Sequence, residues 1–134
     1  MDVDKVVAEL ERRHPGKTII LNTPENPEEI VCETEPGEEK SAAVGVIDRT
    51  RLHYHKELTE IYEVTKGELM MHLDGVKHVI REGEKIEMKP GVRHYAIGDE
   101  TWINVYSTPG WKPEDHILVQ DEEEISRKDF DRKR

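Results

Sequence analysis

Residues 51–67 read RLHYHKELTEIYEVTKG and place His53 and His55 two positions apart, with Glu60 five positions further on. On an α-helix, two residues at this spacing point about 200° away from each other, so the imidazoles could not share one metal ion. On a β-strand, residues i and i+2 point to the same side, and the charged and turn-forming residues around the pair favour a strand. We therefore predict a strand that carries both imidazoles on one face.

Glu60 follows His55 at an odd spacing, which would put it on the opposite face of one continuous strand. The run KELT, residues 56–59, must therefore interrupt the strand by a loop or a bulge. Glu60 can then begin a second strand with its carboxylate turned inward, and Tyr62 and Val64 would share its face. The pattern predicts a pocket wall on this second strand.

A further imidazole follows in GVRHYAIG, residues 91–98, where the turn at Pro90 and Gly91 leads into a strand that opens at His94. Three imidazoles and one carboxylate form a mixed nitrogen and oxygen donor set. Such a set suits a divalent transition metal such as Mn, Fe, Co, Ni or Zn. A six-coordinate ion would keep two positions for water or substrate.

The rest of the chain predicts a short helix and many short strands. An apolar stripe over residues 3–10 indicates the helix, which ends at HPG, residues 14–16. Asp74 and Gly75 form a strong signal for a two-residue hairpin turn. Many short strands with such turns indicate an antiparallel sandwich or barrel. The predicted strands are residues 17–21, 30–34, 42–48, 51–55, 60–66, 68–73, 76–81, 85–89, 94–98 and 101–107.

The composition limits the class of protein and its partners. The chain has 134 residues, which suits one domain, and its 20 Lys and Arg against 30 Asp and Glu give a net charge of −10. This charge repels phosphate backbones and anionic lipid, so we expect no nucleic-acid partner and no membrane. Cys32 has no second cysteine to pair with, and no apolar run approaches the ~20 residues that span a bilayer. We therefore expect a cytoplasmic protein.

Residues 45–98 resemble the cupin superfamily of small double-stranded β-helix, or jelly-roll, barrels. The first cupin motif runs His-x-His, three or four residues, Glu, six residues and Gly, and the chain matches it as far as Gly67. The second motif places Gly, Pro-x-Gly and His at fixed spacings, and Gly83, Gly91 and His94 keep that register. The motifs have glycine, proline and asparagine where this chain has Ile47, Lys89 and Gly98.

The resemblance implies an all-β cupin barrel built from a single domain, residues 1–134, with a short N-terminal helix and a charged C-terminal tail. The barrel core would occupy about residues 42–108, with the helix and two strands in residues 1–41 and a further segment at 109–134. Acids followed by bases in residues 121–134 suggest a solvated helix or a disordered end. Small cupins commonly pair, so we expect a homodimer, in which the two N-terminal strands could add to a partner's sheet edge.

The same resemblance implies that His53, His55, Glu60 and His94 hold one divalent metal, which could be Mn, Fe, Ni, Co or Zn, beside a small-molecule site. The fold alone does not name a reaction. We expect a small metalloenzyme that polarises a carbonyl group of an oxygen-rich substrate, like a sugar isomerase or epimerase. The alternatives are an Fe(II)-dependent dioxygenase and a non-catalytic module that binds or senses a small molecule.

An isomerase needs a general base, for which Tyr62 is the first candidate and His72 the second, although His72 also fits an ordinary strand histidine. We interpret the remaining histidines as surface, strand or packing residues. The large aromatic residues fit core or interface positions. These residues are His14, His78, His116, Trp102, Tyr106 and Trp111.

Overall fold

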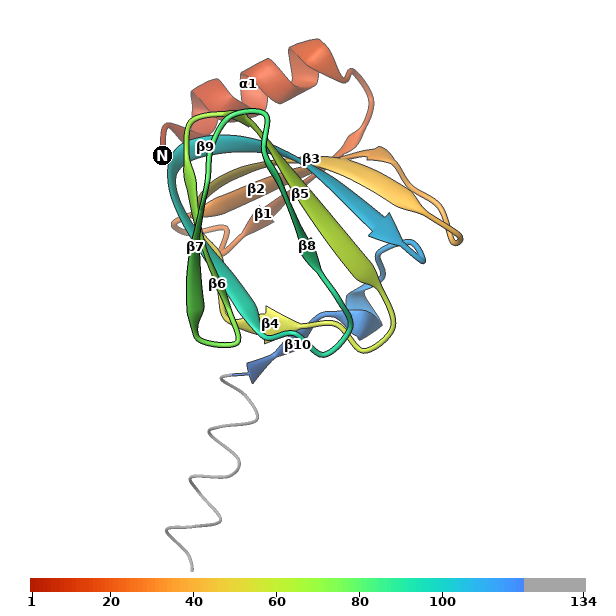
Figure 1. Cartoon of the computed structure of the whole chain (residues 1–134). Coiled ribbons are helices and arrows are strands. Elements are labelled where there is room, and N and C mark those ends of the chain that lie inside the picture. Colours follow the sequence, from red (N-terminus) through yellow and green to blue (C-terminus); the bar gives the residue numbers. More distant parts are fainter. Residues whose placement is uncertain (120–134) are drawn as a thin grey trace, which may run out of the picture.

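The computed structural model describes residues 1–119, and the predicted tail at residues 121–134 lies outside this part (Figure 1). It begins with the predicted helix, α1, Val3–Arg13. Ten strands follow within the described residues, with a 3₁₀ helix, Pro113–Asp115, before the last one. The strands are β1 Thr18–Asn22, β2 Glu29–Glu35, β3 Ser41–Arg49, β4 His53–Tyr54, β5 Thr59–Lys66, β6 Leu69–Leu73, β7 Val76–Ile80, β8 Lys85–Met88, β9 His94–Thr108 and β10 Ile117–Leu118.

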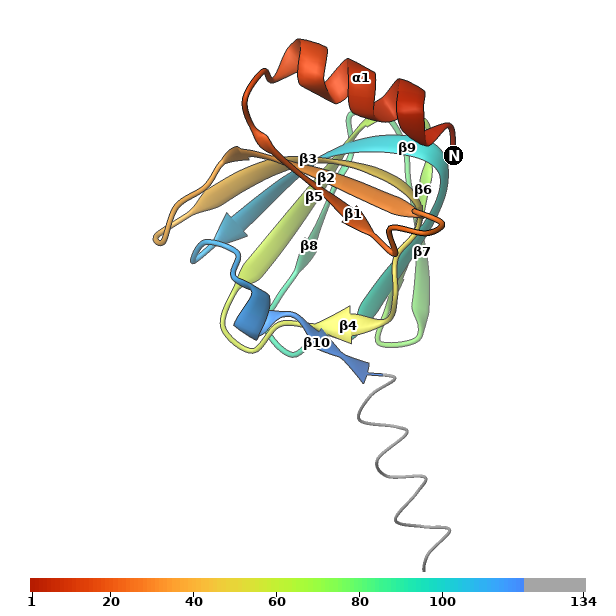
Figure 2. The same cartoon turned by 180° about the vertical axis from the view of Figure 1, so that it is seen from behind.

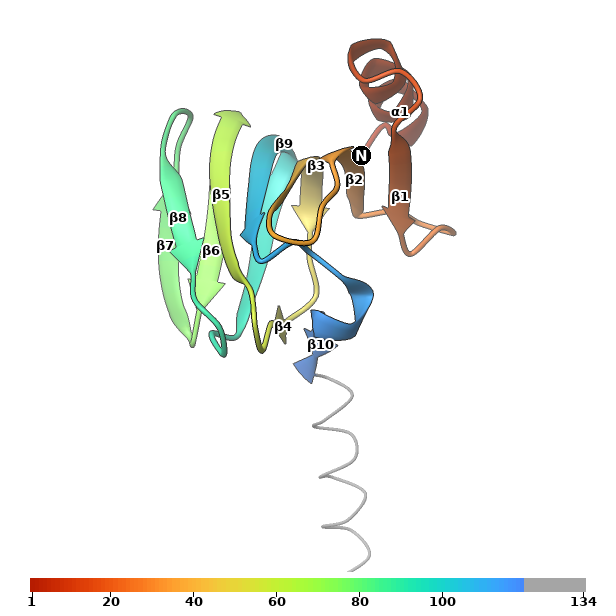
Figure 3. The same ribbon diagram turned by 90° about the vertical axis from the view of Figure 1, so that its right-hand side faces the viewer.

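The strands join in one antiparallel sheet that curls into an open half-barrel (Figures 1 and 3). Its main strand order is β1-β2-β3-β9-β4-β10. The long strand β9 organises the sheet, because it pairs with β3 along one side and with β5 and β6 along the other. Figure 3 shows β5 to β8 on one side of β9 and β1 to β3 on the other. The predicted all-β jelly-roll barrel with a short N-terminal helix is confirmed.

β9 continues through a point where the sequence predicts a break between two strands. The pairing of β9 with β3 changes register between Ile47 and Arg49, which marks a bulge. Glu100 has a positive φ of 47° there, and its amide donates to the Asp48 carboxylate at 2.8 Å. The bulge bends β9 without ending it, so one strand can serve both halves of the barrel.

β1 and β2 extend the chain's own sheet. β1 pairs with one edge of β2 from Thr18 to Asn22, and β3 pairs with the other edge of β2. The two N-terminal strands, which could have joined the sheet of a partner, therefore pair within this chain. β1 is the outermost strand of the main order.

Successive residues along the strands point to opposite faces of the curled sheet and belong to two separate apolar cores. Ile47 and Met71 belong to the core inside the barrel, whereas Val46, the neighbour of Ile47, belongs to a second core on the outer face. Leu10 and other apolar residues of α1 belong to this outer core. Figure 2 shows α1 lying over the outer side of the sheet. Because α1 covers the back of β1 and β2, the inner face of these strands is left to line a cavity. Within residues 1–119, no helix is long and apolar enough to cross a membrane.

Candidate metal centre

The structure brings the side chains of His53, His55, Glu60 and His94 to one point inside the barrel. One donor atom from each residue lies within 4.8 Å of the other three. All four side chains are buried, with exposed fractions of 1–4%. His53 lies on β4, His55 directly after it, Glu60 on β5 and His94 at the start of β9. Three separate backbone segments therefore supply one cluster.

The local sequence explains how the chain turns these residues inward. The predicted strand at residues 51–55 is reduced to the two residues of β4, where His53 pairs directly with His94. The predicted interruption follows it, and β5 then begins at Thr59. Along β5 the buried residues are Glu60, Tyr62 and Val64, as the alternation predicts. The interruption therefore turns the side chain of Glu60 toward the barrel interior, whereas one continuous strand would turn it to the opposite face.

Backbone carbonyl groups orient all three imidazoles. Nδ1 of His53 lies 2.7 Å from the carbonyl of Arg51, Nδ1 of His94 lies 2.9 Å from that of Val92, and Nδ1 of His55 lies 2.7 Å from a carbonyl of the C-terminal segment. A carbonyl oxygen only accepts hydrogen bonds, so each Nδ1 carries a proton. Each neutral ring is then left with its Nε2 lone pair for a ligand, which is the usual arrangement of metal-binding histidines.

Three atoms at the centre of the cluster are buried and have no hydrogen-bond partner among the described residues: Nε2 of His55, Nε2 of His94 and Oε1 of Glu60. The two Nε2 atoms lie 3.5 and 3.4 Å from Oε1, which is long for a hydrogen bond. Buried polar atoms are normally paired, so donors that converge without pairing indicate a shared ligand. The donor set therefore fits a divalent transition metal.

The electrostatics of the cluster differ from one donor to the next. Burial opposes a charge on Glu60, but His55 and His94 outweigh it and hold the pKa of Glu60 below its usual range. Burial also opposes protonation of His55, yet the adjacent Glu60 outweighs it and raises the pKa of His55. Burial, assisted by His94 and His116, lowers the pKa of His53 to about 3. His53 is therefore a neutral donor at neutral pH.

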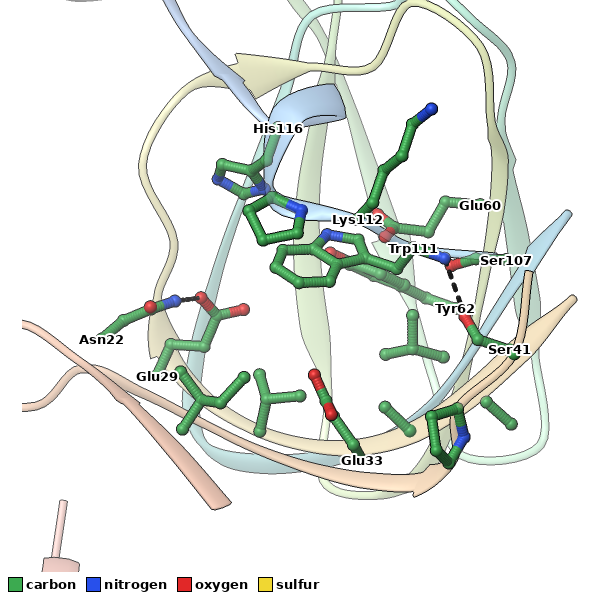
Figure 4. A pocket seen from close by; sticks show the side chains of 18 of the residues that line it. Asn22, Glu29, Glu33, Ser41, Glu60, Tyr62, Ser107, Trp111, Lys112 and His116 are labelled. Atoms are coloured by element: carbon green, nitrogen blue, oxygen red, sulfur yellow. Dashed lines mark hydrogen bonds between the residues drawn. The ribbon is translucent and has the colours of Figure 1, made fainter. Parts of the chain in front are cut away.

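A cavity of about 570 Å³ opens beside the cluster, and His53, Glu60 and Tyr62 lie on its wall. β1 and β2 form the opposite wall, from which Glu29 and Glu33 point inward (Figure 4). The Asn22 amide donates to the carboxylate of Glu29. Burial raises the pKa of Glu29 to about 7, with a further contribution from Glu60. The cavity is thus acidic on the side that faces the cluster.

The third wall comes from residues 109–119, which we name the strap. Trp111 and His116 of the strap line the cavity (Figure 4). The His116 ring stacks on His53, with 4.2 Å between ring centroids and 18° between planes. Burial, followed by the effect of His55, lowers the pKa of His116 to about 4. His116 packs on a member of the cluster, in line with the packing role that the sequence suggests.

Of the other candidate residues, Tyr62 lies on the cavity wall, whereas His72 and His78 do not. Tyr62 reaches the cavity, where burial and Glu60 raise the pKa of its phenol well above 10. His72 follows the inward-facing Met71 on β6, so it points away from the barrel interior and stacks on Tyr95 at 4.3 Å. His72 is not among the residues that line the cavity. His78 lies on strand β7, where it is exposed.

Sequence reasoning missed three features of the site. It assigned no role to Glu29, overlooked the fact that His116 lies against His53, and did not identify Asp115. The alternation of Glu29, Val31 and Glu33 on one face of β2 is a usable signal, because two carboxylates on one strand face are unusual beside an apolar core. The strap carries no comparable periodicity, so its position is visible only in the structure.

Comparisons with known proteins agree with this architecture. The sequence of residues 31–105 matches the Cupin domain family. A search of curated proteins gave no match. Among solved structures, the nucleoside dehydratase Pac13 from Streptomyces, solved with uridine, has a TM-score of 0.69 at 11% identity, covering 78% of this chain and 87% of Pac13.

Two other structures share the fold. KdgF from Halomonas sp. has a TM-score of 0.60 at 16% identity, covering 69% of this chain and 95% of KdgF. An RmlC-like cupin from Shewanella frigidimarina has a TM-score of 0.61 at 19% identity, with 74% and 88% covered. At these identities the likeness concerns the fold. Because the family match extends over more than half of the chain and the curled sheet agrees with it, the chain belongs to the Cupin domain family.

Proposed function

We propose that this cupin binds one divalent transition metal through His53, His55, Glu60 and His94 and acts as a small metalloenzyme on an oxygen-rich molecule. The observation that carries the proposal is the convergence of three buried donor atoms that lack partners among the described residues. The outward Nδ1 contacts support it, because they leave each Nε2 for the ion.

The walls of the cavity support a ligand that is rich in hydroxyl groups and carries no negative charge. Glu29, Glu33 and Glu60 offer carboxylate oxygens, which accept hydrogen bonds from hydroxyl groups and repel anions. Lys112 is the basic residue of the wall, and it is paired with Glu57 at 3.1 Å. Trp111 provides an apolar surface on which a sugar ring or a base could pack. Pac13, which shares the fold, was solved with such an uncharged hydroxylated molecule, uridine.

The reaction that best fits these groups is a proton shift next to a carbonyl group, as in sugar isomerases and epimerases. A bound divalent metal would polarise the carbonyl oxygen and stabilise negative charge that develops on it. With a pKa of about 7, Glu29 can take a proton from the carbon beside the carbonyl and return it to a neighbouring atom. Tyr62 stays protonated because its pKa is raised, so we propose it as a hydrogen-bond donor to substrate.

Metal analysis of untagged protein tests the proposal. The chain is purified without a histidine tag, stripped with a chelator and reloaded separately with Mn, Fe, Co, Ni and Zn. We expect about one ion per chain for at least one metal, and strongly reduced retention in His94→Ala. His78→Ala is the matched control, because it removes an exposed histidine from another strand. Failure of every metal to bind would reject the metal centre.

Turnover assays on the loaded protein separate the possible reactions. Uncharged aldoses, ketoses and nucleosides are incubated anaerobically, and products are followed by NMR in D2O, where a proton shift exchanges hydrogen for deuterium. Anaerobic turnover that disappears in Glu29→Gln supports the isomerase. Substrate-dependent oxygen uptake by the iron form would instead indicate a dioxygenase. Tight binding without turnover would indicate a binding or sensing module.

A further inference from the structure

The three imidazoles of the cluster differ in the origin of the carbonyl group that orients them. His53 and His94 each contact the carbonyl of the residue two positions earlier in the chain. The partner of His55 is Asp115, which is 60 residues away and approaches Nδ1 to 2.7 Å. The orientation of two rings is therefore set locally, whereas that of His55 depends on the strap.

The side chain of Asp115 also holds the loop that joins His55 to Glu60. Its Oδ1 accepts a hydrogen bond from the amide of Lys56 at 2.6 Å, and its Oδ2 accepts from Glu57 at 3.1 Å and from Leu58 at 3.0 Å. A buried carboxylate with 4% exposure thus fixes three consecutive residues of the interruption.

The strap is held in place at both of its ends by contacts other than the one between Asp115 and His55. At its start, the amide of Gly110 donates to the carbonyl of Glu38 at 2.8 Å, and that of Trp111 donates to Oγ of Ser41 at 2.9 Å. Gly110 also lies so close to the carbonyl of Gly37 that a Cβ atom would clash. At its end, β10 pairs with β4. Asp115 therefore lies between two ends of the strap that are each held by hydrogen bonds.

We infer that Asp115 is a positioning residue of the metal centre. Its carbonyl keeps the proton of His55 on Nδ1 and directs Nε2 to the common point. Its carboxylate shapes the loop that brings Glu60 to the same point. Asp115 lies outside the residues that match the family, 31–105, so this support comes from the C-terminal segment of this chain. The inference rests on the proposed metal binding.

Affinity for Co(II), measured by competition with a chelator, tests the carboxylate. The side-chain amide of Asp115→Asn cannot accept all the hydrogen bonds that the loop amides donate to the carboxylate. We therefore expect this variant to bind Co(II) about 10- to 100-fold more weakly and to change its visible absorption spectrum, an effect of the size typical for groups that support metal ligands. Glu114→Gln is the matched control, because it removes the exposed neighbouring carboxylate. Leu10→Ala, which weakens the fold away from the cluster, shows whether lost stability alone lowers the affinity. An affinity of Asp115→Asn within twofold of wild type would overturn the inference.

A second measurement needs no variant. In the Zn(II)-loaded wild-type protein, imidazole ¹⁵N NMR should show His55 with a slowly exchanging proton on Nδ1 and the metal on Nε2. Zinc on Nδ1 of His55 would contradict the inference even if Asp115→Asn failed to fold. If the wild-type chain binds none of Co(II), Zn(II), Mn(II), Fe(II) and Ni(II), the metal centre itself is rejected and the inference with it. Metal binding by wild type that Asp115→Asn retains would reject the positioning role alone.

Discussion

Glu60 remains negatively charged in surroundings where burial alone would favour its neutral form. The nearby rings of His55 and His94 compensate for burial and lower its pKa. A divalent ion at the same point would place positive charge beside this carboxylate and would compete with protons for the same donors. Glu60 is thus the residue on which the charge balance of the centre depends.

The first prediction concerns this charge. Glu60→Gln keeps the shape of the side chain and removes its negative charge, so we expect metal affinity to fall at least about 100-fold, beyond the effect of an outer partner. Isothermal titration with Zn(II) measures the change. Unaltered affinity would show that the carboxylate is not a ligand.

The second prediction concerns Glu29, whose pKa is raised from 4.5 to about 7 in the folded chain. The folded state holds this proton more tightly than the unfolded state, so the resulting stability is complete below about pH 4.5 and is lost as the pH rises through 7. Glu29→Gln cannot ionise. We expect it to gain about 1–2 kcal/mol in free energy of unfolding relative to wild type between pH 5 and pH 8, after allowance for screening in the open cavity.

Urea denaturation at both pH values, with a chelator present, measures this difference. Glu11→Gln is the control for loss of one exposed carboxylate. A difference between Glu29→Gln and wild type that does not change with pH would mean that Glu29 titrates as an exposed residue does.

Among the elements, α1 supports the cavity from behind. Leu10 is fully buried between the helix and the outer face of β2 and β3, together with Ile30, Val46 and Trp102. The guanidinium of Arg13 lies 4.9 Å from the centre of the Trp102 ring and closes the end of this core. The inner face of the same strands carries Glu29 and Glu33. The helix therefore fixes the acidic wall without touching the cluster.

The third prediction follows from this separation. Leu10→Ala leaves a space in the outer core, and we expect the free energy of unfolding to fall by about 2–5 kcal/mol, with one metal ion still bound per chain. Chemical denaturation and metal analysis measure the two effects. Glu11→Ala, on the exposed side of the helix, should change stability by less than about 0.5 kcal/mol. Loss of metal from folded Leu10→Ala would show that α1 and the cluster are coupled.

The elements that the sequence predicts are those whose residues repeat with a local period. The alternation at His53 and His55 and the odd step to Glu60 are sufficient to orient β4 and β5, and Asp74 with Gly75 is sufficient for the β6–β7 turn. Two features required the structure. At the bulge, the amide of Glu100 donates to a carboxylate of another strand, and the strap contacts the cluster through a residue that is 60 positions from His55. Neither leaves a repeating pattern in the chain.

In the whole molecule, β1 forms one outer edge of the sheet, because within residues 1–119 it is paired on one side only, with β2. β1 is the last strand of the main order, and an uncovered edge strand is a common site of association. We propose a homodimer. Static light scattering at micromolar concentration should give twice the mass of one chain, and the value should fall towards that of one chain on dilution. The mass of a single chain at every concentration would contradict the proposal.

The long separation between His55 and Asp115 has a consequence for biosynthesis. A ribosome produces all four cluster residues before it reaches Asp115, so a nascent chain holds the four donors before it has the carbonyl that orients His55, which lies 60 residues after that histidine. Metal captured at that stage would meet a His55 ring that is not yet oriented. We therefore expect the ion to be acquired after release from the ribosome, when the end of the barrel has closed.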